Sequence, residues 1–310
     1  MRITEAAELY IALNVYQPDT AATMLRVAKL FEERSGVSQI RDLGFTPIMK
    51  FRNETFKVAK AVTYNGYLRY LKLLSKWLLE EAYVERDWFA KVKAAPLPEA
   101  PPKTIDEKVL VKAISYLKTD SNAPQPAWFW LIVIRFLYFT GVRRRQIVSI
   151  EIQDLNLDKQ LLTCSYRGSK THRQWDIPIA DDLIPDLEYL VRRTEDALGR
   201  EMREGDRLFN VCLFYHRYKP DPENPLAMRR EQVTGFMKRL SQKIGQRIGA
   251  HRIRHTTATV LCNPEDEEQE PDIFSVQKLL GHTQLSTTRT YVKTKVARIR
   301  TQVNRMSLPK

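Results

Sequence analysis

Apolar residues in the first third of the chain recur at helical spacing. The clearest stripe consists of Tyr64, Leu68, Leu71, Leu74 and Leu78, with Trp77 beside it. Residues 21–31 show a second amphipathic pattern. Side chains three and four positions apart share one face of a helix, so each stripe predicts a helix with one buried face. We therefore expect a small, all-helical N-terminal domain over residues 1–93.

A proline-rich segment interrupts this pattern once. Residues 94–102 contain four prolines in nine positions. Proline fixes its own backbone and restricts the residue before it to extended conformations. Residues 94–103 are therefore expected to form a stiff linker between two domains.

The pattern after the linker begins with helices. Asp106 can cap a helix that runs through Leu117, and residues 128–139 form a second apolar helix. Gly141 allows a tight turn before a third helix begins near Arg143.

Two runs rich in β-forming residues follow, at 160–166 and 174–179, and indicate a hairpin with Lys170 at its turn. Residues 183–194 and 229–247 return to a helical pattern. We expect a fold that is mainly α with a small β-sheet (α+β), in which residues 104–310 form the larger domain.

Composition narrows the class of protein. The most apolar stretch, 127–139, is interrupted by Arg135 and falls short of the roughly 20 apolar residues that cross a bilayer. The three cysteines are far apart and form no C-x-x-C pair, which disfavours a disulfide framework or a zinc finger. No signal peptide is expected at the N-terminus, which carries Glu5 and Glu8. These features predict a cytoplasmic protein with no membrane partner.

The net charge points to a polyanion. The chain has 50 Lys and Arg against 37 Asp and Glu, a formal charge of +13. Residues 1–103 hold 16 basic and 12 acidic side chains, and residues 104–310 hold 34 and 25. Both parts are positive, as expected if both contact one phosphate backbone. A basic protein without such a partner remains an alternative.

Arg143 stands out within the run 143–145. Three adjacent arginines usually form a solvated face. Arg143, however, follows Thr140, Gly141 and Val142 at a sharp turn. An arginine fixed there can present its planar guanidinium to a phosphate.

His251 and His255 have the spacing of zinc ligands on a helix. The metalloprotease pattern needs a glutamate after the first histidine, where this chain has Arg252. Arg252 and Arg254 would repel a divalent ion, which disfavours a zinc site. A helix that carries His251 and Arg254 suits a phosphate oxyanion better. For His255, packing within the domain is an open alternative.

Three further candidate site residues carry little information when each is taken alone. Turn lysines such as Lys170 are mostly solvated, and a single tyrosine among 13 is usually structural. His282 follows Gly281, which ends a helix and fixes the next residue in a loop. Tyr291 comes nine residues later. The joint order of these residues is far more specific than any one of them.

Taken together, the chain resembles the tyrosine recombinases of the phage integrase family. Thr140 to Arg143 matches the first arginine box, Lys170 the hairpin lysine, and His251 to His255 the H-x-x-R box. Leu280, Gly281, His282 and Tyr291 match the final box. The resemblance covers residues 104–310 in order. It departs at Gln146, where the family usually carries a carboxylate that braces the site; an amide still forms hydrogen bonds but brings no charge.

The resemblance implies a covalent 3′-phosphotyrosine and a free 5′ hydroxyl. Arg143 and Arg254 would grip the phosphate oxygens, and His282 would donate a further hydrogen bond. Tyr291 would attack phosphorus, with His251 as the acceptor of its proton. Lys170 would protonate the departing 5′ oxygen. The expected substrate is double-stranded DNA, and the implied mechanism requires no metal and no nucleotide cofactor.

The expected role is integration or excision of a mobile element, with chromosome-dimer resolution as the alternative. A type IB topoisomerase shares this chemistry but acts alone, and a catalytically dead DNA-binding protein is a further alternative. Beyond Tyr291 the chain has six basic residues, no acidic ones and a helical apolar stripe formed by Val292, Val296, Ile299 and Val303. This segment either packs on its own domain or docks into a neighbouring subunit, as family C-terminal helices often do. Docking would close a homotetramer on two DNA sites; accessory DNA-bending or directionality proteins are further candidate partners.

Overall fold

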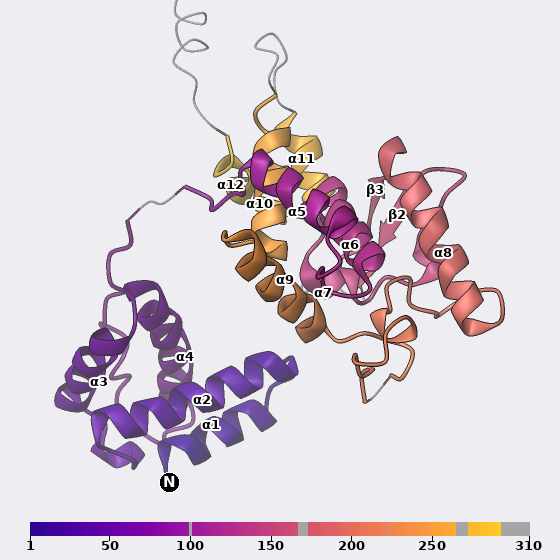
Figure 1. Ribbon diagram of the computed structural model, residues 1–310. Helices are drawn as coiled ribbons and strands as arrows, with labels where there is room; N and C mark the ends of the chain where they lie inside the picture. The colour runs from indigo at the N-terminus through magenta and orange to yellow at the C-terminus, as the bar shows by residue number, and fades with distance from the viewer. Residues whose placement is uncertain (99–100, 167–172, 223, 265–271, 293–310) are drawn as a thin grey trace, which may run out of the picture. The chain divides into compact units, whose positions relative to one another are not determined.

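The computed structural model describes residues 1–98, 101–166, 173–222, 224–264 and 272–292. The chain divides into two compact units, Met1–Ala100 and Pro101–Lys310, and the boundary falls inside the proline-rich segment. The described part of the chain is mainly helical with one small antiparallel sheet, so the predicted fold class is confirmed (Figure 1). None of the described helices is both long and apolar enough to cross a membrane.

The first unit consists of four helices around one apolar core: α1 (Ile3–Ala12), α2 (Pro18–Ser35), α3 (Phe45–Val58) and α4 (Ala61–Glu80). The apolar stripe predicted on α4 is buried, with Tyr64 and Leu78 among its most enclosed side chains. The ring of Phe31 on α2 packs 5.1 Å from that of Phe51 on α3. Helix α2 begins at Pro18 and ends before Gly36, which is left-handed.

The second unit contains eight helices among the described residues: α5 (Glu107–Thr119), α6 (Ala127–Thr140), α7 (Arg144–Ile147), α8 (Ile184–Leu198), α9 (Arg230–Ile244), α10 (Ala250–Leu261), α11 (Ile273–Leu280) and α12 (Leu285–Arg289). Asp106 caps α5 as predicted, because its carboxylate accepts a hydrogen bond from the Lys108 backbone. The third helix expected near Arg143 is only four residues long.

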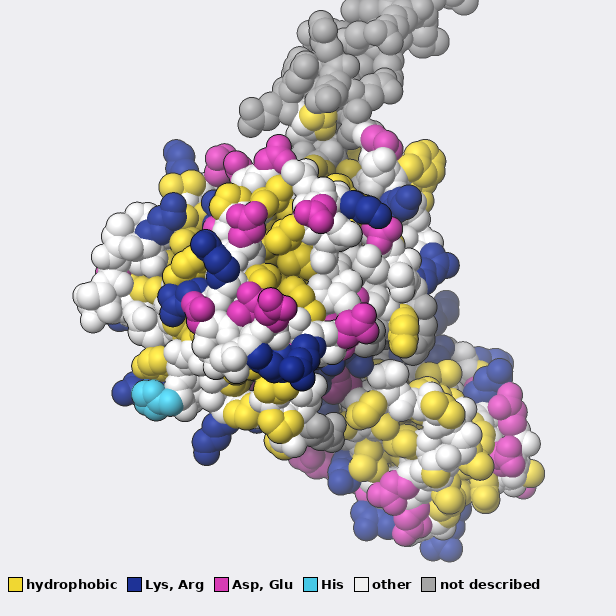
Figure 2. Space-filling view, turned by 90° about the vertical axis from the view of Figure 1, so that its right-hand side faces the viewer, with side chains coloured by type: hydrophobic (Ala, Val, Ile, Leu, Met, Phe, Trp, Pro, Cys, Tyr) yellow, Lys and Arg dark blue, Asp and Glu magenta, His cyan; other side chains and the backbone are white. Residues whose placement is uncertain are grey.

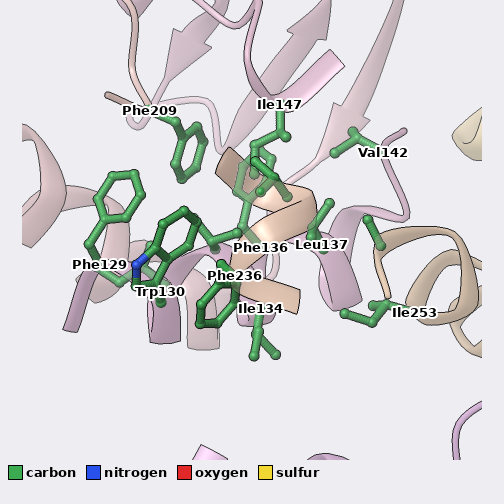
Figure 3. Packing of buried hydrophobic residues seen from close by; sticks show 14 of the residues in the cluster. Phe129, Trp130, Ile134, Phe136, Leu137, Val142, Ile147, Phe209, Phe236 and Ile253 are labelled. Carbon is green, nitrogen blue, oxygen red and sulfur yellow. The ribbon is translucent and has the colours of Figure 1, made fainter. Parts of the chain in front are cut away.

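Helix α6 lies at the centre of this unit. Phe129, Trp130 and Phe136 of this helix are buried, and the ring of Trp130 stacks on that of Phe236 from α9 at 4.2 Å (Figure 3). Val142, which precedes α7, and Ile147, its last residue, also point into this core (Figure 3). Ile253 does the same from α10. These three apolar side chains anchor the segments that carry the predicted arginines.

The sheet has three strands in the order β1 (Leu155–Asn156), β2 (Leu161–Cys164) and β3 (Trp175–Pro178). The predicted hairpin is formed by β2 and β3, which pair antiparallel with Leu162 opposite Ile177. The short β1 was not predicted, because two residues are too few for an alternating pattern to show. The hairpin turn, with Lys170, lies outside the described residues.

Candidate active site

Arg143 is the N-cap residue of helix α7 and follows a constrained turn. Gly141 ends α6 in the left-handed conformation, with φ of +61°, and a side chain there would meet Leu280. The Arg143 backbone N–H donates to Oε1 of Gln146 at 2.7 Å. The next turn therefore holds the backbone of Arg143, while its side chain stays half-buried.

Gln146, the residue that departs from the family pattern, is almost completely buried at 2% exposure. Its Oε1 serves the backbone of Arg143, whereas its Nε2 has no hydrogen-bond partner among the described residues. A buried amide whose NH2 group has no acceptor carries an energetic cost. Gln146 is therefore a polar group enclosed beneath the arginine turn.

Arg254 is buried on α10 and joins three segments. Its two terminal nitrogens donate to the carbonyl oxygens of Gly141 and Leu280, each at 2.6 Å. These carbonyls lie at the C-terminal ends of α6 and α11, where backbone acceptors lack helical partners and attract cations. Burial and the nearby Arg143 lower the pKa of the Arg254 guanidinium to about 9, so it stays cationic at neutral pH. Each terminal nitrogen keeps a second N–H for another acceptor.

The hydroxyl of Tyr291 contacts His255. Tyr291 Oη lies 2.7 Å from His255 Nδ1, and only 5% of the tyrosine is exposed. Burial raises the pKa of the Tyr291 phenol, and Arg254 opposes this shift. Burial, followed by His251 and Arg254, lowers the pKa of His255 to about 4. At neutral pH the pair therefore consists of a protonated phenol and a neutral imidazole.

The sequence had indicated His251, not His255, as the partner of this phenol. His251 is exposed, and no described contact joins it to the Tyr291 hydroxyl. Its ring packs 4.2 Å from that of His255, one helical turn away. The spacing of the two histidines placed both on one face of α10, but which of them reaches Tyr291 depends on how the residues after α12 pack.

His282 lies beside Tyr291 in the loop after α11. The two rings are nearly parallel, 6.2 Å apart, and His282 Nδ1 lies 2.9 Å from the buried Thr288 hydroxyl. The His282 backbone N–H donates to the Gln277 carbonyl, a bond that closes the helix end. Burial, with Arg254 and Arg143, lowers the pKa of His282 to about 4.

Trp175 packs against the loop before His282, a contact that the sequence did not indicate. Its indole N–H donates to the Leu279 carbonyl at 3.0 Å. Gly281 has φ of +61°, and a Cβ there would lie 2.4 Å from the indole ring. Strand β3, which follows the Lys170 turn, thus contacts the loop that holds His282.

An open groove of about 1010 Å³ adjoins the site between α7, α9 and the start of α10. No acidic residue of the described chain lines this groove. Elsewhere on the surface, as on the face in Figure 2, lysines and arginines are mixed with acidic side chains. Seven basic residues line the groove, together with His251: Arg143, Arg144, Arg145, Arg230, Lys238, Arg247 and Arg254. Such a surface suits a phosphate backbone.

Of the six predicted site residues, the structure places five in the second unit. Arg143, His251 and Arg254 line the groove, whereas His282 and Tyr291 stack beside Arg254. Lys170 and the C-terminal segment 293–310 lie outside the described residues. Within the described ranges no cluster of His, Cys, Asp and Glu could hold a metal ion.

The chain resembles proteins that carry recombinase names. A Pseudomonas aeruginosa protein that bears the name tyrosine recombinase XerC is 27% identical over 305 residues, which are 94% of this chain and 68% of that protein. Tyrosine recombinase XerA of Pyrococcus furiosus is 27% identical over 219 residues, 70% of this chain and 66% of its own length. The chain thus spans about two thirds of these relatives.

Solved structures share its fold. The Tn1549 transposon integrase in complex with circular intermediate DNA matches with a TM-score of 0.73 at 16% identity, over 99% of this chain and 100% of that one. A lambda integrase dimer bound to a COC′ core site matches with a TM-score of 0.70 at 15% identity, over 96% and 81%. Residues 103–298 match the phage integrase family itself. This chain belongs to the phage integrase family.

Proposed function

We propose that this protein is a site-specific DNA recombinase that cleaves and rejoins strands through a covalent bond to Tyr291. The observation that carries the proposal is the position of the Tyr291 hydroxyl. The hydroxyl is within hydrogen-bond distance of His255 Nδ1, and the tyrosine ring stacks beside that of His282. The cations Arg254 and Arg143 both favour the ionised form of the phenol. These groups adjoin a groove lined by basic residues.

The proposed chemistry follows from these groups. Arg143 and Arg254 neutralise the non-bridging oxygens of one phosphodiester, and His282 adds a hydrogen bond as the five-coordinate transition state forms. Tyr291 Oη attacks phosphorus, and the bond to the 5′ oxygen breaks. Lys170 protonates that oxygen, which leaves as a hydroxyl. The 3′-phosphotyrosine conserves the bond energy, so a second strand can reverse the step.

A substrate that traps the intermediate tests this activity. A nicked duplex whose short 5′ fragment diffuses away after cleavage should accumulate a covalent protein–DNA adduct. Tyr291→Phe removes only the hydroxyl, so it should bind the same DNA and form no adduct. Adduct formation by the Phe variant would reject Tyr291 as nucleophile, and no adduct with the unaltered chain would reject the activity.

We further propose that the protein acts as a homotetramer on two duplex sites in the integration or excision of a mobile element. Support comes from the apolar and basic segment after Tyr291, which suits docking into a neighbouring subunit. Covalent adducts mapped across the host genome distinguish the roles. Adducts at the two ends of one element are expected, whereas adducts at one chromosomal site outside any element would indicate dimer resolution.

A further inference from the structure

The histidine that contacts the tyrosine hydroxyl has no part in the mechanism described so far. His255 Nδ1 and Tyr291 Oη lie 2.7 Å apart, within the range of a direct proton transfer. The rings are 5.4 Å apart and inclined by 41°. Among the residues that the structure describes, it is the one hydrogen bond of the Tyr291 hydroxyl.

The surroundings of the pair determine its protonation state. Tyr291 packs with Ala258, Cys262 and Leu280, so its phenol is shielded from water. Three elements supply the titratable groups that act on the pair: His251, Arg254 and the Cys262 thiol at the end of α10, Arg143 just before α7, and His282 after α11. Burial, followed by His251 and Arg254, keeps His255 neutral, with a pKa of about 4. Its imidazole therefore has a lone pair free to accept a proton across the neutral range.

We propose that His255 accepts the proton of Tyr291 through Nδ1 as Tyr291 Oη attacks phosphorus. This inference rests on the proposed function. The bond from Oη to phosphorus forms, the bond from phosphorus to the 5′ oxygen breaks, and the phenolic proton moves to Nδ1. The leaving 5′ oxygen takes a separate proton, from Lys170, so charge and atoms balance. The proton returns to Tyr291 when the strand is rejoined.

This assignment changes the role of His251. His251 is exposed and lines the groove with Arg143 and Arg254, so it is placed to contact phosphate oxygens. It also neighbours His255. Burial, Arg254 and Arg143 lower the pKa of His251, so it too is neutral at neutral pH.

The matched variants are His255→Asn and His255→Ala. Asparagine places an amide where Nδ1 lies, so it keeps a hydrogen bond to the phenol but cannot take the proton. Alanine removes both the hydrogen bond and the proton acceptor. His216→Asn, at an exposed histidine, is the control. Each full-length variant is first checked for thermal stability and for binding to the duplex site.

The readout is the rate of adduct formation on the nicked duplex as a function of pH. The rate of the unaltered chain should be nearly independent of pH between about pH 6 and about pH 8, because His255 stays neutral there and Arg254, whose pKa is about 9, stays cationic. His255→Asn should be slower by about 10² to 10⁴ at neutral pH, the usual contribution of a general base. Its rate should rise with pH, because hydroxide must then remove the phenolic proton.

A fluorinated tyrosine at position 291, whose phenol is more acidic, should restore much of the rate of His255→Asn. If His255 only positions the ring, the Asn variant will cleave at the normal rate with the normal pH profile, and the inference is wrong. Lack of an adduct with the unaltered chain would instead reject the proposed function.

A measurement on the unaltered protein does not depend on any variant. The ¹⁵N chemical shifts of His255 report which ring nitrogen carries the proton. An unprotonated Nδ1 with the proton on Nε2 is expected, because Nδ1 must accept from the phenol. A proton on Nδ1 would overturn the inference.

Discussion

Gly281→Ala tests whether the contact between β3 and the His282 loop fixes the active site. The change adds one methyl group where φ is +61° and where a Cβ would lie 2.4 Å from Cζ2 of Trp175. Carbon atoms prefer a separation of about 3.5 to 4.0 Å, so either the indole or the loop must move by roughly 1 Å. The indole is held by its hydrogen bond to the Leu279 carbonyl, so the loop is expected to yield.

The loss of folding stability expected from Gly281→Ala has two parts. A side chain in the left-handed region costs about 1 to 2 kcal/mol. Overpacking at a filled site adds about 1 to 3 kcal/mol. Gly199→Ala isolates the first part, because Gly199 ends α8 with φ of +65° and has nothing within 4 Å of its Cβ position. The contact with Trp175 should therefore appear as the difference between the two variants.

Scanning calorimetry of the full chain measures this difference. For a unit of this size, 1 kcal/mol shifts Tm by about 2 to 4 °C, so Gly281→Ala should unfold about 2 to 12 °C below Gly199→Ala. Gly281→Ala should also slow adduct formation by displacing His282, whereas Gly199→Ala should cleave normally. Equal Tm values for the two variants would refute the reasoning about Trp175.

Three further predictions address the remaining groups. Lys170→Ala should cleave ordinary DNA slowly but a 5′-bridging sulfur substrate almost normally, because a thiolate leaves without a proton; equal defects on both would assign Lys170 to phosphate binding. Gln146→Ala should slow adduct formation without weakening DNA binding in a gel-shift assay, because it removes the acceptor for the Arg143 backbone N–H. Gln146→Glu keeps an acceptor there and should remain active. Full cleavage by the Ala variant would contradict this role of Gln146. Deletion of residues 297–310 should preserve binding to one site but abolish recombination between two, and full recombination would show that the segment is dispensable for assembly.

Local patterns in the sequence were sufficient for most elements. The stripe of α4, the cap of α5 and the paired β2 and β3 all followed from spacing, because residues on one face of a helix or strand are fixed by its period. The order of the family boxes likewise identified Arg143, His251, Arg254, His282 and Tyr291 as candidates. Their chemical types alone indicated an anionic phosphate substrate.

The tertiary structure decided which of these groups touch. Helical spacing put His251 and His255 on one face of α10, yet only packing of the chain after α12 brought Tyr291 to His255. The bonds of Arg254 to Gly141 and Leu280 and the contact of Trp175 with Gly281 also join segments distant in sequence. The periodicity of the sequence carries no information about such contacts, because they depend on how the helices and strands pack together around a filled core. The sequence thus determined which reactive side chains the protein carries, and the packing determined which histidine lies against Tyr291.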